Sequence, residues 1–196
     1  MSVPRARHTA TLLATGDVLV TGGGTTFHGD AGKVTSNVEI YTPRTNSWRV
    51  AAPMSIPRYT HEAALMADGR VLVAGGWSAM TSDDVSKAST EIFDPAANRW
   101  SAGPPLGTAR AEFVMVRLPG GRLLAVAGVD RSGRLLDSAE LLGTAADAWA
   151  PTGKLAEARM WPAVALLPDG RVLLAGGGTD VNANHRSVMC EVYAAP

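Results

Sequence analysis

The chain has 196 residues, of which 46% are hydrophobic and 18% are charged. This balance excludes an intrinsically disordered chain and allows one domain with a buried core. Its 18 basic residues equal its 18 acidic ones, so no overall field attracts nucleic acid or an anionic membrane, and we expect neither as a partner.

The cysteine count and the N-terminal sequence bear on the cellular compartment of the protein. Cys190 is the single cysteine, which excludes an internal disulfide and a cysteine metal cluster and fits a reducing compartment. The first ten residues contain no apolar core of a signal peptide. No stretch approaches the roughly 20 apolar residues of a membrane span. These features favour the cytoplasm without fixing the location.

An internal repeat is evident when the chain is aligned with itself. Segments 4–24, 57–77, 109–129 and 158–178 align without a gap, and their arginines recur at intervals of 53, 52 and 49 residues. These arginines are Arg5, Arg58, Arg110 and Arg159. A pair of small residues begins 17 positions after each one: Gly22-Gly23, Gly75-Gly76, Ala127-Gly128 and Gly176-Gly177. The alignment divides one domain, 1–196, into repeats 1–53, 54–105, 106–154 and 155–196.

Each repeat predicts four strands. An apolar run such as 63–66 leads through an Asp-Gly turn into a second run, 71–74, which ends at the small pair. A third strand carries a repeated glutamate: Glu39, Glu91, Glu140 and Glu191. A further turn leads to a short outer strand that begins near a tryptophan in the first three repeats: Trp48, Trp100 and Trp149. The periodicity of these tryptophans predicts a packing role.

The repeat resembles the motifs of the kelch family, which are Arg-x-x-His, a Gly pair, and then Tyr or Phe followed by Trp. The resemblance covers nearly the whole chain and implies an all-β fold, a β-propeller built of four blades of four antiparallel strands. The pattern ends at Tyr193, so we expect the last blade to lack its outer strand. Repeat three has Ala127 and Phe113, and repeat four has Pro162, where the family pattern has Gly and His. We expect these blades to be less regular there.

The length of the repeat varies in one loop only. The step from the second small residue to the glutamate is 16, 15, 12 and 14 residues in the four repeats. Surface loops tolerate such variation and carry function, so the four loops, 24–37, 77–89, 129–138 and 178–187, predict a binding face. The candidate ligand-binding residues in them are Trp77, His28, Asp83, Asp84, Asp130, Arg131, Asp180, Asn182, His185 and Arg186. Trp161, at the entrance of a strand, is a further candidate. Trp77 and Trp161 break the repeat pattern and suit stacking on a sugar or another planar group, or filling space between blades.

The residues repeated in every blade have two interpretations. The four arginines could form a basic ring around a channel, or each could pair with a glutamate of the third strand. We favour the structural pairing, because residues present in every repeat are usually framework. His8 and His61 could hold a metal, but histidines satisfied within the blade are the simpler interpretation. The sequence therefore predicts no metal and no cofactor.

Catalysis receives less support than binding. Residues 169–178 resemble a stretch of kelch-type copper radical oxidases, but Met160-Trp161-Pro162 and the late Cys190 do not match their copper site, so no catalytic residue is predicted. We expect a binding module for a protein or a small polar ligand. The alternatives are a small propeller enzyme acting on a carbohydrate or metabolite, and a fragment of a larger kelch protein. A second copy could complete a larger ring.

Overall fold

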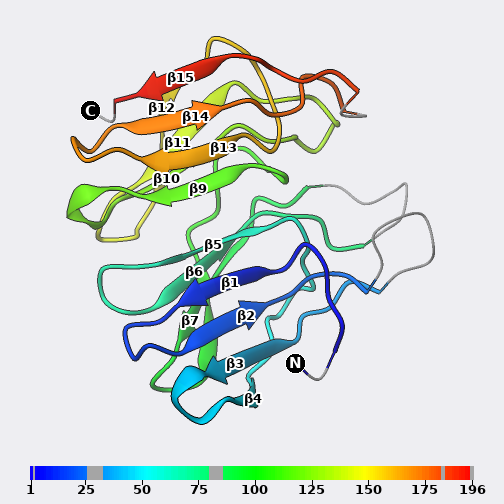
Figure 1. Ribbon diagram of the computed structural model, residues 1–196, viewed down its shortest axis with the longest axis vertical. Coiled ribbons are helices and arrows are strands. Elements are labelled where there is room, and N and C mark those ends of the chain that lie inside the picture. The colour runs from blue at the N-terminus through cyan, green and yellow to red at the C-terminus, as the bar shows by residue number, and fades with distance from the viewer. Residues whose placement is uncertain (2, 26–32, 80–85, 182–183, 195–196) are drawn as a thin grey trace.

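The computed structural model describes residues 1, 3–25, 33–79, 86–181 and 184–194. These residues form four antiparallel sheets, three of four strands and one of three, each built from strands consecutive in the chain. The prediction of an all-β propeller with a shortened last blade is confirmed (Figure 1). The described part of the chain contains no helix with the length and apolar character that a membrane crossing requires.

Each sheet is one blade, numbered in chain order. Blade 1 consists of β1 (Thr9–Leu12), β2 (Val18–Thr21), β3 (Val38–Thr42) and β4 (Ser47–Ala51). Blade 2 consists of β5 (Glu62–Leu65), β6 (Val71–Ala74), β7 (Thr90–Asp94) and β8 (Arg99–Gly103). Blade 3 consists of β9 (Val114–Arg117), β10 (Leu123–Val126), β11 (Ser138–Leu142) and β12 (Trp149–Lys154). Blade 4 consists of β13 (Ala163–Leu166), β14 (Val172–Ala175) and β15 (Cys190–Tyr193). Two short 3₁₀ turns occupy Pro43–Thr45 and Pro119–Gly121.

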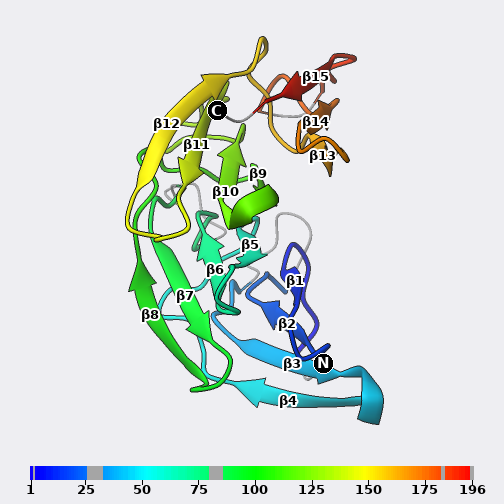
Figure 2. The same ribbon diagram turned by 90° about the vertical axis from the view of Figure 1, so that its left-hand side faces the viewer.

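The blades stand in a curved row (Figure 2). The inner strands β1, β5, β9 and β13 contact one another in succession. Buried side chains of adjacent blades form the core, as where Leu72 of blade 2 meets Phe113 and Leu123 of blade 3. Val and Leu predominate in the second strand of every blade, and in blades 2 and 3 all four positions of this strand are buried because both of its faces are covered.

The two ends of the row expose apolar side chains. Leu12 of blade 1 is 64% exposed and Val192 of blade 4 is 49% exposed. Trp48 is 40% exposed, whereas Trp149 is buried between blades. The packing predicted for the repeated tryptophans therefore applies fully to Trp149, while the half-exposed Trp48 packs on the ring of Tyr41 in its own blade, at 5.0 Å between ring centroids. A ring completed by a second copy stays a prediction, which the native mass in solution tests.

Blade 3 is as regular at its small pair as the other blades. Ala127 has φ +65°, close to +63° at Gly22, +67° at Gly75 and +64° at Gly176. Alanine keeps this left-handed conformation although glycine adopts it more easily. The expectation of local irregularity at Ala127 is wrong, because the backbone geometry of the repeat holds even without the glycine.

Candidate functional site

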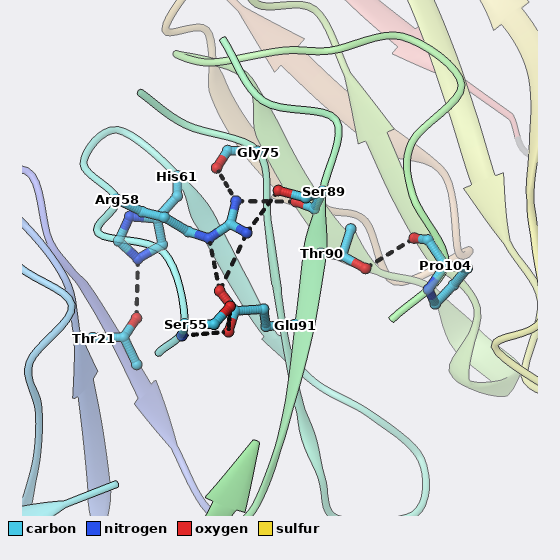
Figure 3. Close-up of polar contacts among 9 residues, drawn as sticks. All are labelled: Thr21, Ser55, Arg58, His61, Gly75, Ser89, Thr90, Glu91 and Pro104. Atoms are coloured by element: carbon cyan, nitrogen blue, oxygen red, sulfur yellow. Dashed lines mark hydrogen bonds and ion pairs between the residues drawn. The ribbon is translucent and has the colours of Figure 1, made fainter. Parts of the chain in front are cut away.

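The repeated arginine of each blade is a buried framework residue. In blade 2, Arg58 Nη1 donates to the carbonyls of Gly75 at 2.7 Å and Ser89 at 3.0 Å, and Nη2 donates to Glu91 Oε1 at 3.3 Å. The other carboxylate oxygen of Glu91 accepts hydrogen bonds from the backbone and hydroxyl of Ser55, both at 2.7 Å (Figure 3). The guanidinium thus joins the ends of the second and third strands of one blade.

The other three blades contain the same ion pair. Arg5 pairs with Glu39, Arg110 with Glu140 and Arg159 with Glu191. All four arginine side chains are fully buried. Because their donors bond to their own blade, this geometry supports a framework role for them rather than a basic ring open to a ligand.

Two positions after each arginine, the chain lines the mouth of one shared cavity. The four equivalent residues are Arg7, Thr60, Glu112 and Trp161. All four have left-handed backbone conformations, with φ of 56°, 48°, 57° and 49°. Such a conformation costs a non-glycine residue of the order of 1 kcal/mol. The same strain in four blades indicates a fixed geometry that presents four chemically different side chains.

Backbone hydrogen bonds join these four residues from blade to blade. Thr60 donates to the carbonyl of Arg7 at 3.0 Å, Glu112 to that of Thr60 at 3.2 Å, and Trp161 to that of Glu112 at 2.9 Å. The mouth is therefore held by the backbone, and its side chains can vary without loss of this connection. The first strand of each blade begins at the mouth. Because this strand pairs antiparallel with the second, its beginning lies beside the end of the second strand, where the variable loop starts.

A cavity of about 370 Å³ opens at this mouth. Its lining comes from residues 7–10 of blade 1, residues 60–63 of blade 2, Glu112 and Phe113 of blade 3, and Trp161 of blade 4. The Arg7 guanidinium lies over the Trp161 ring at 5.7 Å from its centroid, within the range of a cation–π contact. Burial raises the pKa of Glu112, opposed by the charge of Arg7 and by a hydrogen bond from the Trp77 indole.

Glu62 places a second carboxyl in the cavity. It lies on the inner strand β5 and is partly exposed. Loss of hydration on burial raises its pKa to about 8, opposed by a hydrogen bond from the backbone N–H of Met115 in β9. A carboxyl with such a pKa is largely protonated at neutral pH.

The two histidines of the first blades also line the cavity. His61 Nε2 lies 3.0 Å from Thr21 Oγ1 and 3.2 Å from Thr9 Oγ1. Burial, helped by the charge of Arg58, lowers the pKa of His61 to about 3, and burial also lowers the pKa of His8. Both rings are thus neutral at pH 7. Among the residues that the structure describes, no group of three or more His, Cys, Asp or Glu side chains is arranged to hold a metal ion.

Comparisons with known proteins agree with the repeat geometry. The family model described as Kelch motif matches residues 5–55 and 63–107. The chain contains kelch repeats. This kelch chain also superposes on the solved structure of YjhT with a TM-score of 0.80 and 17% identity, over 98% of this chain and 70% of that one. At this identity the superposition supports the propeller fold alone.

Curated kelch proteins match part of the chain. Kelch-like protein 9 of Mus musculus is 30% identical over 102 residues, which are 52% of this chain and 16% of that protein. An F-box/kelch-repeat protein of Arabidopsis thaliana is 37% identical over 73 residues, which are 37% of this chain and 18% of that protein. The kelch chain therefore spans less than a fifth of the length of these two relatives.

The two tryptophans that break the kelch pattern both reach the mouth. Trp161 is one of the four equivalent residues of the mouth, and its side chain is 43% exposed. Trp77 is linked to the mouth as a side-chain hydrogen-bond donor to Glu112. Arg186 lines a smaller cavity of about 270 Å³ next to Trp161. These three candidates are thus brought to one region.

The candidate aspartates of the loops bond within their own turns. Asp130 accepts hydrogen bonds from Ser132 and Arg134, and Asp180 accepts from the backbone and ring of His185. Arg131 and Asp130 line a separate cavity of about 540 Å³ with residues 107–109. His28, Asp83, Asp84 and Asn182 lie outside the described residues.

Arg7, Thr60, Glu62 and Glu112 were missed by the reasoning from sequence. That reasoning followed variation in loop length, whereas these residues stand inside the segments that align without a gap. The signal that could have found them is a change of residue type at one aligned position, which is Arg, Thr, Glu and Trp in repeats one to four. A second signal was the charge of Glu62 within a short inner strand.

Proposed function

We propose that this kelch chain is a binding module that holds a segment of a protein partner at the mouth formed by Arg7, Thr60, Glu112 and Trp161. One observation carries the proposal: four blades place four different side chains at one strained, backbone-linked position. A fixed backbone with variable side chains is the arrangement expected of a recognition surface on a repeat protein.

The mouth has the features that peptide recognition needs. Trp161 offers a partly exposed ring, and aromatic and arginine side chains dominate the energetics of many interfaces. Arg7 and Glu112 supply charges of both signs beside that ring. The variable loops start at the same end of the blades, where the second strands end.

Selection from a random peptide library displayed on phage tests the proposal. Trp161→Ala removes the exposed ring of the mouth, and Trp48→Ala is the matched control, since Trp48 has nearly the same exposure on blade 1. We expect the selected peptides to lose at least tenfold in affinity for Trp161→Ala and to keep their affinity for Trp48→Ala. Peptides that bind both variants like the parent chain, or a failure to select any peptide, would contradict the proposal.

A small propeller enzyme acting on a carbohydrate or metabolite is a second candidate. It is favoured by the raised pKa of Glu62, about 8, because a carboxyl that is protonated near neutral pH can serve as a general acid. Incubation with a panel of glycosides and free sugars, followed by proton NMR, tests it. Turnover that Glu62→Gln abolishes would support catalysis, and unchanged spectra with the whole panel would count against it.

A further inference from the structure

Glu62 has no equivalent in the other blades. The aligned residues are Thr9, Val114 and Ala163, so the packing of the inner strands does not require a carboxyl at this position. At the junction of blades 1 and 2, Thr9 bonds to His61. At the junction of blades 2 and 3 the corresponding pair is Glu62 and Phe113, and a phenyl ring offers no conventional hydrogen bond.

The cavity around Glu62 contains one more carboxyl than cations. Arg7 is the cation among its lining residues, and its charge acts on Glu112. His8 and His61 are neutral at pH 7 because burial lowers the pKa of both rings. The influences on Glu62 are burial and the N–H of Met115, without a neighbouring cation. An ionised Glu62 would therefore lack a counter-ion among the described residues.

Three buried polar atoms in the same lining also lack hydrogen-bond partners among the described residues. They are Thr60 Oγ1, His8 Nδ1 and His61 Nδ1. Buried polar atoms are rarely left without a partner, since this costs free energy comparable to a lost hydrogen bond. All three belong to residues that line the cavity, so its wall is polar as well as acidic.

We propose that the cavity binds a cationic side chain of the bound protein, a lysine ammonium or an arginine guanidinium, with Glu62 as its counter-ion. Such a group brings at least three donors and no acceptor, which suits a carboxylate. Trp161 adds a ring on which a guanidinium already rests within the chain, that of Arg7. A volume of about 370 Å³ accommodates one long side chain.

This inference rests on the proposed function, because it names the chemistry of the partner at the same mouth. It also implies a pH dependence. The cation needs an ionised Glu62, so affinity falls as protonation competes, by up to about tenfold per pH unit below the pKa near 8. The pKa of His61, about 3, keeps its ring neutral between pH 6.5 and 8.5, whereas the pKa of Glu62 lies within this range.

Titration with single-residue probes tests the inference. The probes are Nα-acetyl-arginine, Nα-acetyl-lysine and Nα-acetyl-norleucine as methylamides, together with free butylamine, followed by NMR shifts at pH 6.5 and 8.5. We expect the arginine or lysine probe to bind at least tenfold more tightly than norleucine and to weaken at least fivefold at pH 6.5. Glu62→Gln should abolish both effects, and Asp147→Asn, at an exposed carboxylate in a turn of blade 3, should change neither.

Glu62→Thr, which installs the blade 1 residue, is a second neutral variant if Glu62→Gln does not fold. Equal binding of norleucine, binding that survives in both Glu62 variants, or no binding of any probe overturns the inference. Binding of butylamine without binding of the blocked amino acids overturns it too, because the site would then take a free amine. Library peptides that depend on Trp161 but contain no required Lys or Arg would overturn the inference alone and leave the proposed function standing.

Discussion

Arg7 and Trp161 connect the first and the fourth blade across the mouth of the cavity. The guanidinium carbon of Arg7 lies 5.7 Å from the centroid of the Trp161 ring. Both residues occupy the same position of the repeat and both have left-handed φ values. Their contact therefore adds a side-chain link to the backbone bonds that join neighbouring blades at this position.

A double-mutant cycle should detect this link. We expect Arg7→Ala and Trp161→Ala to show a coupling of about 0.5–1 kcal/mol in the free energy of unfolding, because a partly exposed cation–π contact has that strength. Urea unfolding of the parent, both single variants and the double variant measures it. Arg44→Ala combined with Trp161→Ala is the control and should give additive effects. A coupling near zero for Arg7 would show that the two side chains do not stabilise each other.

Gly75 should not tolerate a methyl group. A Cβ at Gly75 would lie 2.3 Å from the carbonyl oxygen of Arg110 and 2.8 Å from the Phe113 ring, at φ +67°. Moving a backbone carbonyl and a core ring is costly, so we expect Gly75→Ala to lower the free energy of unfolding by about 2–4 kcal/mol. Thermal and urea unfolding measure the loss.

The matched control is Ala127→Gly, the reverse change at the equivalent position of blade 3. It relieves a left-handed alanine but increases the freedom of the unfolded chain, so the two effects oppose each other and the net change should stay within about 1 kcal/mol. Similar losses for Gly75→Ala and Ala127→Gly would refute the steric explanation.

The fold could be predicted from sequence because its signals are repeated. The arginines, small pairs and glutamates recur at fixed spacings, and the predicted second strand 71–74 coincides with β6 (Val71–Ala74). The inner strand begins one residue earlier than predicted, at Glu62. A charged residue is not expected at the start of a buried strand. The environment of Glu62 depends on the packing of neighbouring blades, which the sequence of one repeat does not show.

The site was predictable in part. Trp161 was found because it interrupts a repeated pattern, but Arg7 and Glu112 were not, although they occupy the same aligned position. A ligand contact of Asp130 stays a prediction: its carboxylate bonds to Ser132 and Arg134 within its own turn, and the residue also lines a cavity. Sequence reveals residue types at loop positions, but the geometry of a turn decides whether a carboxylate is already satisfied.

Glu62 should make the protein less stable as the pH rises. Its pKa is about 8 in the folded chain and near the ordinary 4.5 when unfolded, so the folded state holds the proton more tightly. The stability that this proton contributes is complete below pH 4.5 and is lost as the pH rises towards 8. Glu62→Gln, which stays neutral, should gain about 4 kcal/mol relative to the parent between pH 5 and pH 8.5. Urea unfolding at both pH values measures the gain.

Asp147→Asn is the control for this pH dependence. Asp147 is exposed and bonds only to the N–H of the next residue among the contacts of the described chain, so its variant should track the parent at both pH values. If the difference between Glu62→Gln and the parent were the same at pH 5 and pH 8.5, Glu62 would not be the group with the raised pKa.

The framework ion pairs should differ in strength between blades 2 and 4. Arg58 has Glu91 as its carboxylate partner, whereas Arg159 contacts both Glu191 and Glu157. Removing the charge of a sole partner leaves a buried guanidinium uncompensated, so Glu91→Gln should cost about 3–5 kcal/mol of stability. Glu191→Gln should cost less, about 1–2 kcal/mol, because Glu157 remains and Glu191 is more exposed than Glu91.

The second carboxylate of Arg159 can be tested directly. If Glu157 compensates for the loss of Glu191, the double variant Glu157→Gln with Glu191→Gln should lose more stability than the sum of the two single variants, since Arg159 then has no carboxylate at all. Strictly additive losses in urea unfolding would mean that Glu157, at 3.4 Å, does not support the guanidinium. The smaller cost of Glu191→Gln would then have to come from the greater exposure of blade 4, whose outer face no further blade covers among the described residues.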